Sequence, residues 1–348
     1  MLIEERTYPT HPGKWREYLA LYEAEGLALN RRALLGILAA LTSPWTLAQA
    51  AYPSRPVLLI HGFGPGGNAD VVARLVAHRL QDLMHQPVTV DIKSGAGGML
   101  ATSFVAKATA DGHSLVMLTG AHTVSAAMRK SLPYDPVKDF AFVSTVTSFP
   151  FVIAVRAEHP AKTLGQLIDM ARNGTNKVSF TSVGVGSTQH LVGELLGGSA
   201  GAQLLHIPYR GGGAPVQSVI AGEVDVLIDT PTVATPHVRS GRLRALAVTS
   251  AAPWPSLPGV PPVANTLPGF EVRSWLGLAA PAGTPDAIIR SLNAHVRKLL
   301  QSPEVQKTLA TLGSEPAYST PEAMGEMVQN DIARWRSVIA RSGVQLDR

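Results

Sequence analysis

Residues 57–70 read Val-Leu-Leu-Ile-His-Gly-Phe-Gly-Pro-Gly-Gly-Asn-Ala-Asp, and this stretch is the most informative in the chain. Its apolar start predicts a buried strand. A glycine-rich turn follows, and apolar residues then recur at helical spacing between Val71 and Leu80. Glycines let a ligand approach the backbone closely, and the first N–H groups of a helix favour negative charge. The stretch therefore predicts an anion-binding turn between a strand and a helix.

The composition is that of a globular protein. The chain has 348 residues, of which 45% are hydrophobic and 16% are charged, and this length is enough for two domains. The formal net charge of +5 is scattered along the sequence, which argues against a nucleic-acid partner. Cysteine is absent, so disulfides, thiol catalysis and a lipid-modified cysteine are excluded. The histidines show no spacing typical of a metal site, and we expect no metal.

The first fifty residues look foreign to the rest. Residues 31–50 combine Arg31-Arg32, a short apolar run and the triplet Ala48-Gln49-Ala50, which is the anatomy of a secretory signal. The apolar run is too short to span a bilayer. We expect export, with cleavage near Ala50. Residues 1–30 read as a strand, a turn and an amphipathic helix, and resemble the start of a NIPSNAP-like domain. We expect this fragment to be absent from the mature protein.

From Ala51 onward, strand patterns alternate with helix patterns, which predicts an α/β fold of parallel sheets covered by helices. The expected strands are Val57–Ile60, Val88–Val90, Ser114–Leu118, Phe142–Val146, Phe151–Val155, Lys177–Thr181, Val224–Ile228 and Leu243–Thr249. The expected helices are Asp70–Met84, Ala101–Lys107, Leu164–Asn173, Gln189–Gly197, Pro215–Ala221, Val233–Ser240, Pro285–Gln301, Pro303–Leu312 and Pro321–Ser342.

Two passages divide this part of the chain. Two strands abut through Ser148-Phe149-Pro150 with no helix between them, and prolines crowd the passage 252–285. Extended segments at two places predict two crossovers between lobes. The expected first lobe is 51–150 plus 253–348, and the expected second lobe is 151–252. A hinged pair of lobes has a central cleft, where small ligands usually bind.

Three further turns resemble the first. Residues 181–190 form a second strand-turn-helix unit rich in glycine and hydroxyl groups, and the turns at 209–215 and 225–232 follow the same plan. Asp229 is a candidate for orienting a loop, or a bound amine if the ligand has one. The plainer interpretation is that the turns at 181–190 and 225–232 cap their helices and bind nothing, with His190 as a packing residue.

Two enzyme classes compete with a binding function. Residues 62–67 match the G-x-G-x-x-G of a dinucleotide site, with Asp91 after the second strand. The same run imitates the oxyanion loop of an α/β-hydrolase, but the literal G-x-S-x-G match at Gly197–Gly201 follows a helix instead of a strand. Four anion-friendly turns without a nucleophile–base pair favour binding over catalysis. We therefore expect no catalytic residues and no cofactor.

Many collinear segments between residues 53 and 346 resemble the tripartite tricarboxylate transporter receptors, the Bug family of periplasmic solute-binding proteins. These segments are 62–70, 94–98, 132–140, 184–191, 206–211, 222–226, 241–249, 268–271 and 280–285. The resemblance implies a two-lobed periplasmic-binding-protein fold, type II-like. It implies a monomeric periplasmic receptor for a small carboxylate, which is a di- or tricarboxylate, an amino acid or an aromatic acid. A membrane permease would be its partner.

The resemblance also implies that the ligand carboxylate is clamped between turns of the two lobes. The residues it assigns to binding are Phe63, Gly64, Gly66, Gly67, Asn68, Asp70, Thr181, Gly184, Gly186, Ser187, Thr188, His190, Asp229, Thr230 and Pro231. The family usually reads Pro-Phe-Pro-Pro-Gly-Gly where this chain has residues 62–67. Because two prolines are replaced by glycine, we expect a looser first turn.

Overall fold

The computed structural model describes residues 16–17, 20, 52–174 and 177–342. Residues 1–51 form one unit and residues 52–348 form another. The predicted signal segment 31–50, with its cleavage site, lies outside the described residues, as does all of 1–30 except Arg16, Glu17 and Ala20. The predictions for both segments therefore stay predictions, and the second unit carries the fold described below.

Six strands form the first sheet, in the order β11-β4-β10-β3-β1-β2. In chain order they are β1 (Val57–His61), β2 (Val88–Ile92), β3 (Ser114–Thr119), β4 (Phe140–Pro150), β10 (Arg273–Pro281) and β11 (Glu315–Pro316). Strand β1 runs parallel to β2 and β3, whereas β10 runs antiparallel to β3 and β4. The sheet is mixed because β10 enters it from the other lobe instead of through a helical crossover on one face.

Five strands form the second sheet, in the order β7-β6-β8-β5-β9. They are β5 (Val152–Arg156), β6 (Ser179–Ser182), β7 (Leu205–Pro208), β8 (Val226–Asp229) and β9 (Leu243–Val248). Strand β6 is parallel to β7 and β8, and β5 is antiparallel to β8 and β9. The prediction of purely parallel sheets is therefore wrong for both halves, because in each one strand arrives directly from the other sheet.

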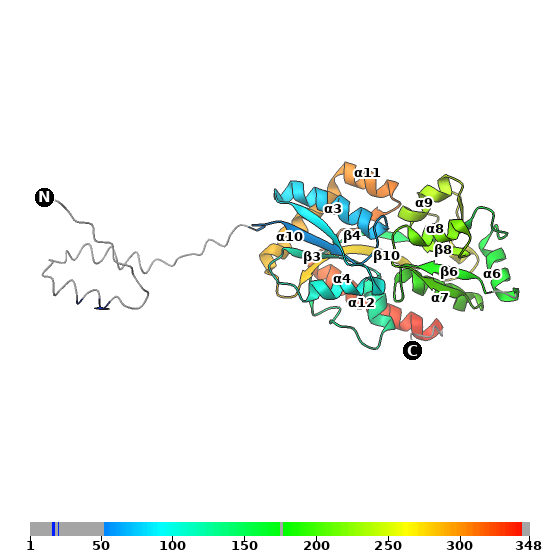
Figure 1. The fold of residues 1–348 in the computed structure, drawn as a ribbon, viewed down its shortest axis with the longest axis horizontal. Coiled ribbons are helices and arrows are strands. Elements are labelled where there is room, and N and C mark those ends of the chain that lie inside the picture. Colours follow the sequence, from blue (N-terminus) through cyan, green and yellow to red (C-terminus); the bar gives the residue numbers. More distant parts are fainter. Residues whose placement is uncertain (1–15, 18–19, 21–51, 175–176, 343–348) are drawn as a thin grey trace. The chain divides into compact units, whose positions relative to one another are not determined.

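Helices cover both sheets (Figure 1). The helices of the first half are α3 (Asn68–Met84), α4 (Met99–Ala106), α5 (Ala121–Met128), α10 (Asp286–Gln301), α11 (Pro303–Thr311) and α12 (Pro321–Ser342). Those of the second half are α6 (Leu164–Asn173), α7 (Thr188–Ala200), α8 (Ala214–Ala221) and α9 (Pro231–Arg239). Short 3₁₀ turns lie at Ala96–Gly98 and Val263–Asn265. In α3, Val72, Val76 and Leu80 lie four residues apart and are all buried, as helical periodicity requires.

The chain passes directly from one sheet to the other. Strand β4 ends at Pro150 and β5 begins at Val152, and the return runs between β9 and β10. We call the part built on the first sheet the first lobe and the part built on the second sheet the second lobe. The predicted α/β fold with two lobes and two crossovers is confirmed, while the residue limits assigned to each lobe stay a prediction.

Three strands and one α-helix were not predicted, namely β7, β10, the two-residue β11 and α5. The strand β10 lies in the proline-rich passage that was expected to be extended linker, and its apolar run RSWLGLAAP shows no alternation because both faces of a central strand are buried. Helix α5 and strand β7 are short and carry little periodic pattern. Local sequence alone therefore could not identify them, because their stability comes from packing against distant parts of the chain.

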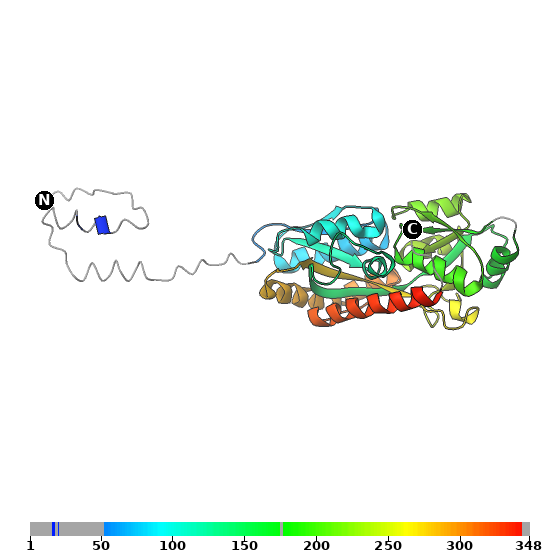
Figure 2. The same cartoon turned by 90° about the horizontal axis from the view of Figure 1, so that it is seen from below.

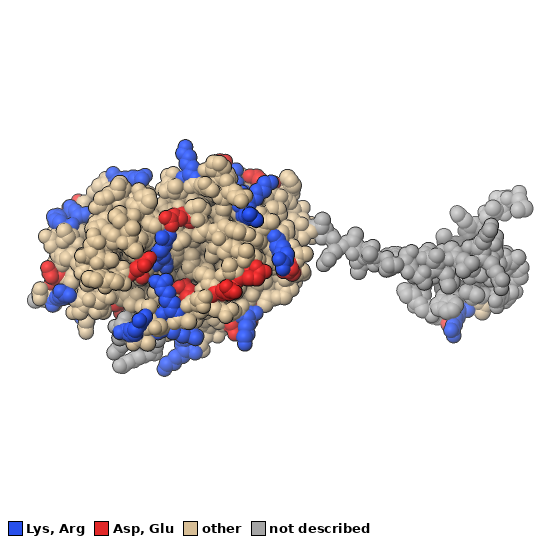
Figure 3. All heavy atoms as spheres, turned by 180° about the vertical axis from the view of Figure 1, so that it is seen from behind, with Lys and Arg blue, Asp and Glu red and all other residues tan. Residues whose placement is uncertain are grey.

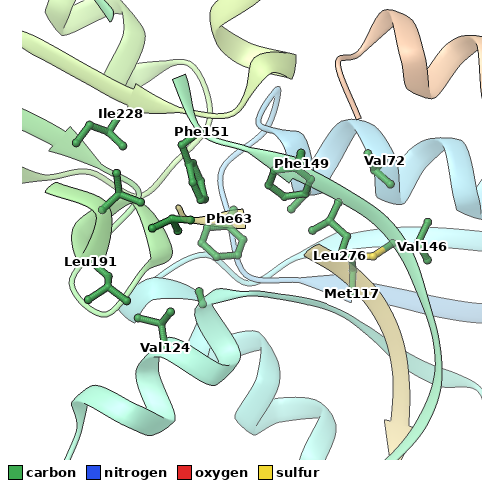
Figure 4. Packing of buried hydrophobic residues seen from close by; sticks show 14 of the residues in the cluster. Phe63, Val72, Met117, Val124, Val146, Phe149, Phe151, Leu191, Ile228 and Leu276 are labelled. Carbon is green, nitrogen blue, oxygen red and sulfur yellow. The ribbon is translucent and has the colours of Figure 1, made fainter. Parts of the chain in front are cut away.

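The hydrophobic core continues across the junction of the lobes. Phe149 and Phe151 flank the β4–β5 crossover, and Phe63 lies beside them (Figure 4). The rings of Phe149 and Phe151 meet edge to face with centroids 6.1 Å apart. Helix α12 runs along the first lobe and also contacts α7 of the second (Figure 2). The junction is thus packed with aromatic groups on the same side as the turns predicted to bind ligand.

Candidate ligand-binding site

A small cavity of about 50 Å³ lies between the lobes. Its walls are Phe63, Gly67, Asn68, Ala69, Thr119, Phe149, Phe151, Val183, Thr188, Gln189, Gly212, Asp229, Thr230, Ser274 and Leu276. Both lobes contribute, and aromatic and aliphatic side chains alternate with amides and hydroxyls. Within this described lining, Asp229 is the one residue with an ionisable side chain. The cavity therefore has the mixed lining of a small-molecule site, without a cationic side chain.

The first lobe presents the N-terminus of α3 to the cavity. Gly67 is the N-cap residue and offers no capping side chain, so the first-turn N–H groups of Asn68 and Ala69 remain available. The Nδ2 atom of Asn68 is buried without a protein partner. Backbone and side-chain donors thus converge on the cavity, where the helix dipole adds positive potential.

A buried network holds the turn before α3. The N–H of Phe63 donates to His61 Nδ1 (3.4 Å), which assigns the ring proton to Nε2, 3.3 Å from Asp70 Oδ1. The N–H of Gly66 and the Nε of Arg74 also donate to the Asp70 carboxylate, both at 2.9 Å. Burial lowers the pKa of the His61 imidazole, which keeps the ring neutral. Asp70 therefore positions the turn and is not among the residues that line the cavity.

The second lobe presents the N-terminus of α7. The Ser187 hydroxyl caps this helix by accepting from His190 N–H (3.2 Å), which leaves the N–H groups of Thr188 and Gln189 without an intrahelical partner. His190 Nδ1 accepts from Gly186 N–H (3.3 Å), and its ring stacks on His206 with centroids 3.9 Å apart. His190 therefore shapes the turn from behind instead of reaching the cavity.

Asp229 lies at the end of β8, where the polar turn into α9 begins. Its Oδ1 accepts from Thr230 N–H (2.7 Å) and from the Thr230 hydroxyl (3.4 Å). Burial raises the pKa of Asp229 to about 7, against the opposing effect of hydrogen bonds from Thr230 and Gln189. This carboxyl group therefore titrates near neutral pH at the wall of the cavity.

The lobes touch directly around the cavity. Gly64 N–H donates to the Arg210 carbonyl of the second lobe (3.0 Å). The Ser125 hydroxyl donates to the Gly186 carbonyl (3.0 Å), and the Thr232 hydroxyl lies 2.7 Å from Asn68 Oδ1. A proline at position 64 would lack the donated N–H. The glycine predicted to loosen the first turn thus supplies a hydrogen bond between the lobes.

Surface charge contributes little to the site. On the face shown in Figure 3, basic and acidic side chains are interspersed. Exposed pairs such as Arg290–Asp286 (2.6 Å) are screened by solvent and stabilise little. The described residues contain no group of three or more His, Asp or Glu side chains suited to a metal. The electrostatics of the cavity come mainly from two helix N-termini and one buried carboxyl group.

The predicted binding residues divide into two groups. Those that line the cavity are Phe63, Gly67, Asn68, Thr188, Asp229 and Thr230. Those in the same turns but outside the lining are Gly64, Gly66, Asp70, Thr181, Gly184, Gly186, Ser187, His190 and Pro231. Glycine and capping residues dominate the second group, because they shape the turns while the first residues of each helix face the ligand space.

Other lining residues were not predicted. They are Ala69, Thr119, Phe149, Phe151, Val183, Gln189, Gly212, Ser274 and Leu276. Thr119 ends β3, and ligands of α/β sheets usually bind beyond the carboxyl ends of strands, so this position carried a usable signal. Ser274 and Leu276 belong to the unpredicted strand β10, and their position follows only from the tertiary fold.

The hydrolase alternative finds no support in the site. Ser199 is exposed near the C-terminal end of α7, and Gly201 caps that helix in the left-handed conformation, so the motif is not a strand-to-helix elbow. Ser182 lies 2.6 Å from His206 Nε2, but its hydroxyl is buried and accepts from Gly184 N–H (3.1 Å). Ser182 therefore closes a turn.

None of the helices in the described ranges has the length and apolarity needed to cross a bilayer.

Comparison with known sequences places the chain in context. The model of the tripartite tricarboxylate transporter family receptor matches residues 72–344. A UPF0065 protein from the tcbD-tcbE intergenic region of Pseudomonas sp. is 37% identical over 314 residues, covering 89% of this chain and 94% of the relative. Protein BugT of Bordetella pertussis is 35% identical, covering 85% of this chain and 91% of its own length.

Solved structures also resemble this chain. An R. palustris protein with adipate is 34% identical, with a TM-score of 0.81, over 84% of this chain and 99% of that one. MatC from Rhodopseudomonas palustris with bound malate is 32% identical, with a TM-score of 0.79, over 83% and 100%. These findings confirm the periplasmic-binding-protein fold. With the family model spanning most of its length, this chain belongs to the tripartite tricarboxylate transporter family of receptors.

Proposed function

We propose that this protein is a non-enzymatic periplasmic receptor that binds a small carboxylate between its lobes. The observation that carries the proposal is the meeting of two helix N-termini, from α3 and α7, at one cavity without a lysine or arginine in its described lining. Neutral N–H donors hold a carboxylate without the desolvation cost of an ion pair, and they let the ligand leave. The relatives solved with adipate and malate support this ligand class.

In this proposal, the carboxylate lies between the first turns of α3 and α7. Asn68, Ala69, Thr188 and Gln189 supply donors, directly or through ordered waters. The other predicted residues of the three turns hold the backbone that carries these donors in place. Phe149 and Phe151 pack against the apolar part of the ligand.

Ligand binding would favour the closed arrangement of the lobes. A ligand that contacts both lobes interacts more strongly with the closed state, and so shifts the hinge equilibrium toward it. The bonds from Gly64 to Arg210 and from Ser125 to Gly186 would form on closure. We propose that a membrane permease of the tripartite tricarboxylate type recognises this closed form, that the receptor acts as a monomer, and that residues 31–50 direct its export.

A thermal-shift series on the full-length protein tests the proposal. The ligands are dicarboxylates, tricarboxylates, acidic amino acids, aromatic acids and NAD. A ligand at a hundred times its dissociation constant stabilises the folded state by about 2.7 kcal/mol, which is a rise of a few degrees in Tm. We expect such a rise with one class of carboxylate and none with NAD. A rise with NAD alone would favour a dinucleotide-dependent enzyme instead.

A further inference from the structure

The polar side chains that line the cavity include one acid and no base, and this restricts the ligand. Hydrogen-bond donors from α3 and α7 suit a carboxylate, but the same lining contains the Asp229 carboxyl group and no basic side chain. Asp229 is only 3% exposed. Its hydrogen-bond donors, Thr230 and Gln189, are all neutral, so the buried charge has no cationic partner, and a ligand that supplies a further donor gains affinity from it.

The residues around Asp229 supply no charged partner for its carboxylate. Its neighbours are Val152 on β5, Gln189 on α7 and Thr230 at the start of α9, none of which is ionisable. Thr230 occupies Oδ1 with two hydrogen bonds, and no charged side chain perturbs the group. Burial raises the pKa of Asp229 to about 7, so the group is mostly ionised at pH 8. A hydrogen-bond donor from the ligand stabilises this ionised form more than the protonated one.

The contact between Asp229 and Gln189 restricts where that donor must be. Gln189 belongs to the first turn of α7, and its side chain hydrogen-bonds to Asp229. A ligand carboxylate at the α7 N-terminus therefore lies close to the Asp229 carboxyl group. The matching donor is a substituent on the carbon next to the ligand carboxylate.

We infer that Asp229 selects 2-amino or 2-hydroxy carboxylates over acids that lack a hydrogen-bond donor at that carbon. The inference rests on the proposed function and specifies its substrate class. An ammonium or hydroxyl group donates to Asp229 while the neighbouring carboxylate accepts from the α7 N–H groups. An acid without that substituent leaves the buried Asp229 carboxylate with only its neutral donors, Thr230 and Gln189. A second ligand carboxylate placed there would be repelled.

Three matched acids test the inference by calorimetry on the full-length protein at pH 8. Succinate, L-malate and L-aspartate share a four-carbon dicarboxylate skeleton and carry hydrogen, hydroxyl and ammonium, respectively, on the second carbon. Asp229→Asn removes the charge with little change of shape. Asp225→Asn makes the same chemical change just before β8 and outside the cavity. The Asp225 carboxylate accepts hydrogen bonds from the Ser179 N–H (2.8 Å) and hydroxyl (2.7 Å).

The wild-type protein and Asp225→Asn should bind aspartate or malate at least about tenfold more tightly than succinate, the range expected for a hydrogen bond to a charged group. Asp229→Asn should reduce that ratio to within about threefold, partly by binding succinate more tightly. Equal binding of all three acids by the wild type, or an unchanged ratio in Asp229→Asn, would overturn the inference and leave the carboxylate receptor standing. Failure of every carboxylate to bind would overturn both.

A second measurement needs no variant, in case Asp229→Asn does not fold. The preference of the wild-type protein for aspartate over succinate should increase between pH 6.5 and 8.5, because Asp229 loses its proton over this range. A preference that stays constant would contradict a role for this carboxyl group.

Discussion

At the scale of single residues, buried polar groups near the cavity have separate tasks. Asp70 and His61 hold the turn before α3 through hydrogen bonds to Phe63, Gly66 and each other. Asp229 instead faces the ligand space. His61 and Asp229 each end a strand, whereas Asp70 lies in the first turn of α3. Sequence reasoning could nominate Asp70 and Asp229 but could not tell a positioning carboxylate from a lining one. That distinction depends on side-chain direction, which only the tertiary structure specifies.

Asp229 should make the stability of the unliganded protein depend on pH. Its pKa is about 7 when folded, above the ordinary value of 3.8, so the folded state retains a proton that the unfolded chain releases. The free energy of unfolding should therefore be highest below pH 4 as far as this group is concerned, and fall by a few kcal/mol as pH rises to about 7.

Urea denaturation at pH 4.5 and 7.5 checks this prediction. The loss of stability on going to the higher pH should be smaller in Asp229→Asn than in the wild type, because the amide does not titrate. Asp225→Asn keeps the Asp229 carboxyl group and should behave like the wild type. Parallel pH dependence in wild type and Asp229→Asn would show that Asp229 does not titrate as described.

At the scale of elements, two glycine turns from opposite lobes meet. A Cβ atom added at Gly212 would lie 2.5 Å from the Pro65 carbonyl oxygen, and one at Gly64 would lie 3.0 Å from the Gly211 carbonyl oxygen. The sequence indicated both turns as anion-friendly because of their glycines, but not that they contact each other. The contact joins residues almost 150 positions apart, and no local pattern encodes such a pairing.

Gly212→Ala should weaken ligand binding by obstructing closure. The new methyl group meets backbone of the first lobe, which cannot move aside as a flexible side chain would. Gly201→Ala is the matched control, because Gly201 also has a positive φ (60°, against 71° for Gly212) but has open space around it. Both variants should lose about 1 kcal/mol of stability from backbone strain.

Calorimetry with the acid that gives the largest thermal shift separates the effect on ligand binding from the effect of backbone strain on stability. We expect Gly212→Ala to reduce affinity at least about tenfold, which corresponds to 1.4 kcal/mol, and Gly201→Ala to leave it unchanged. Equal affinities in the two variants would mean that the contact between the turns plays no part in closure.

At the scale of the whole molecule, the sequence predicted more of the architecture than of the strand directions. Alternating patterns indicated two α/β lobes, and the strand pair around Ser148-Phe149-Pro150 indicated the first crossover. The mixed sheets were missed because β5 and β10 cross between lobes, which reverses their direction against the neighbouring strands. The cavity lies where these crossing strands and the helix N-termini meet, so its full lining depends on the complete topology.

The central claim is that a carboxylate binds between the N-termini of α3 and α7. A crystal structure of the protein with the acid that gives the largest thermal shift tests it most directly. We predict a carboxylate bonded, directly or through one ordered water, to first-turn N–H groups of both helices, with Asp229 facing another part of the ligand. A ligand bound outside this cavity, or held by the N-terminus of one lobe alone, would contradict the account.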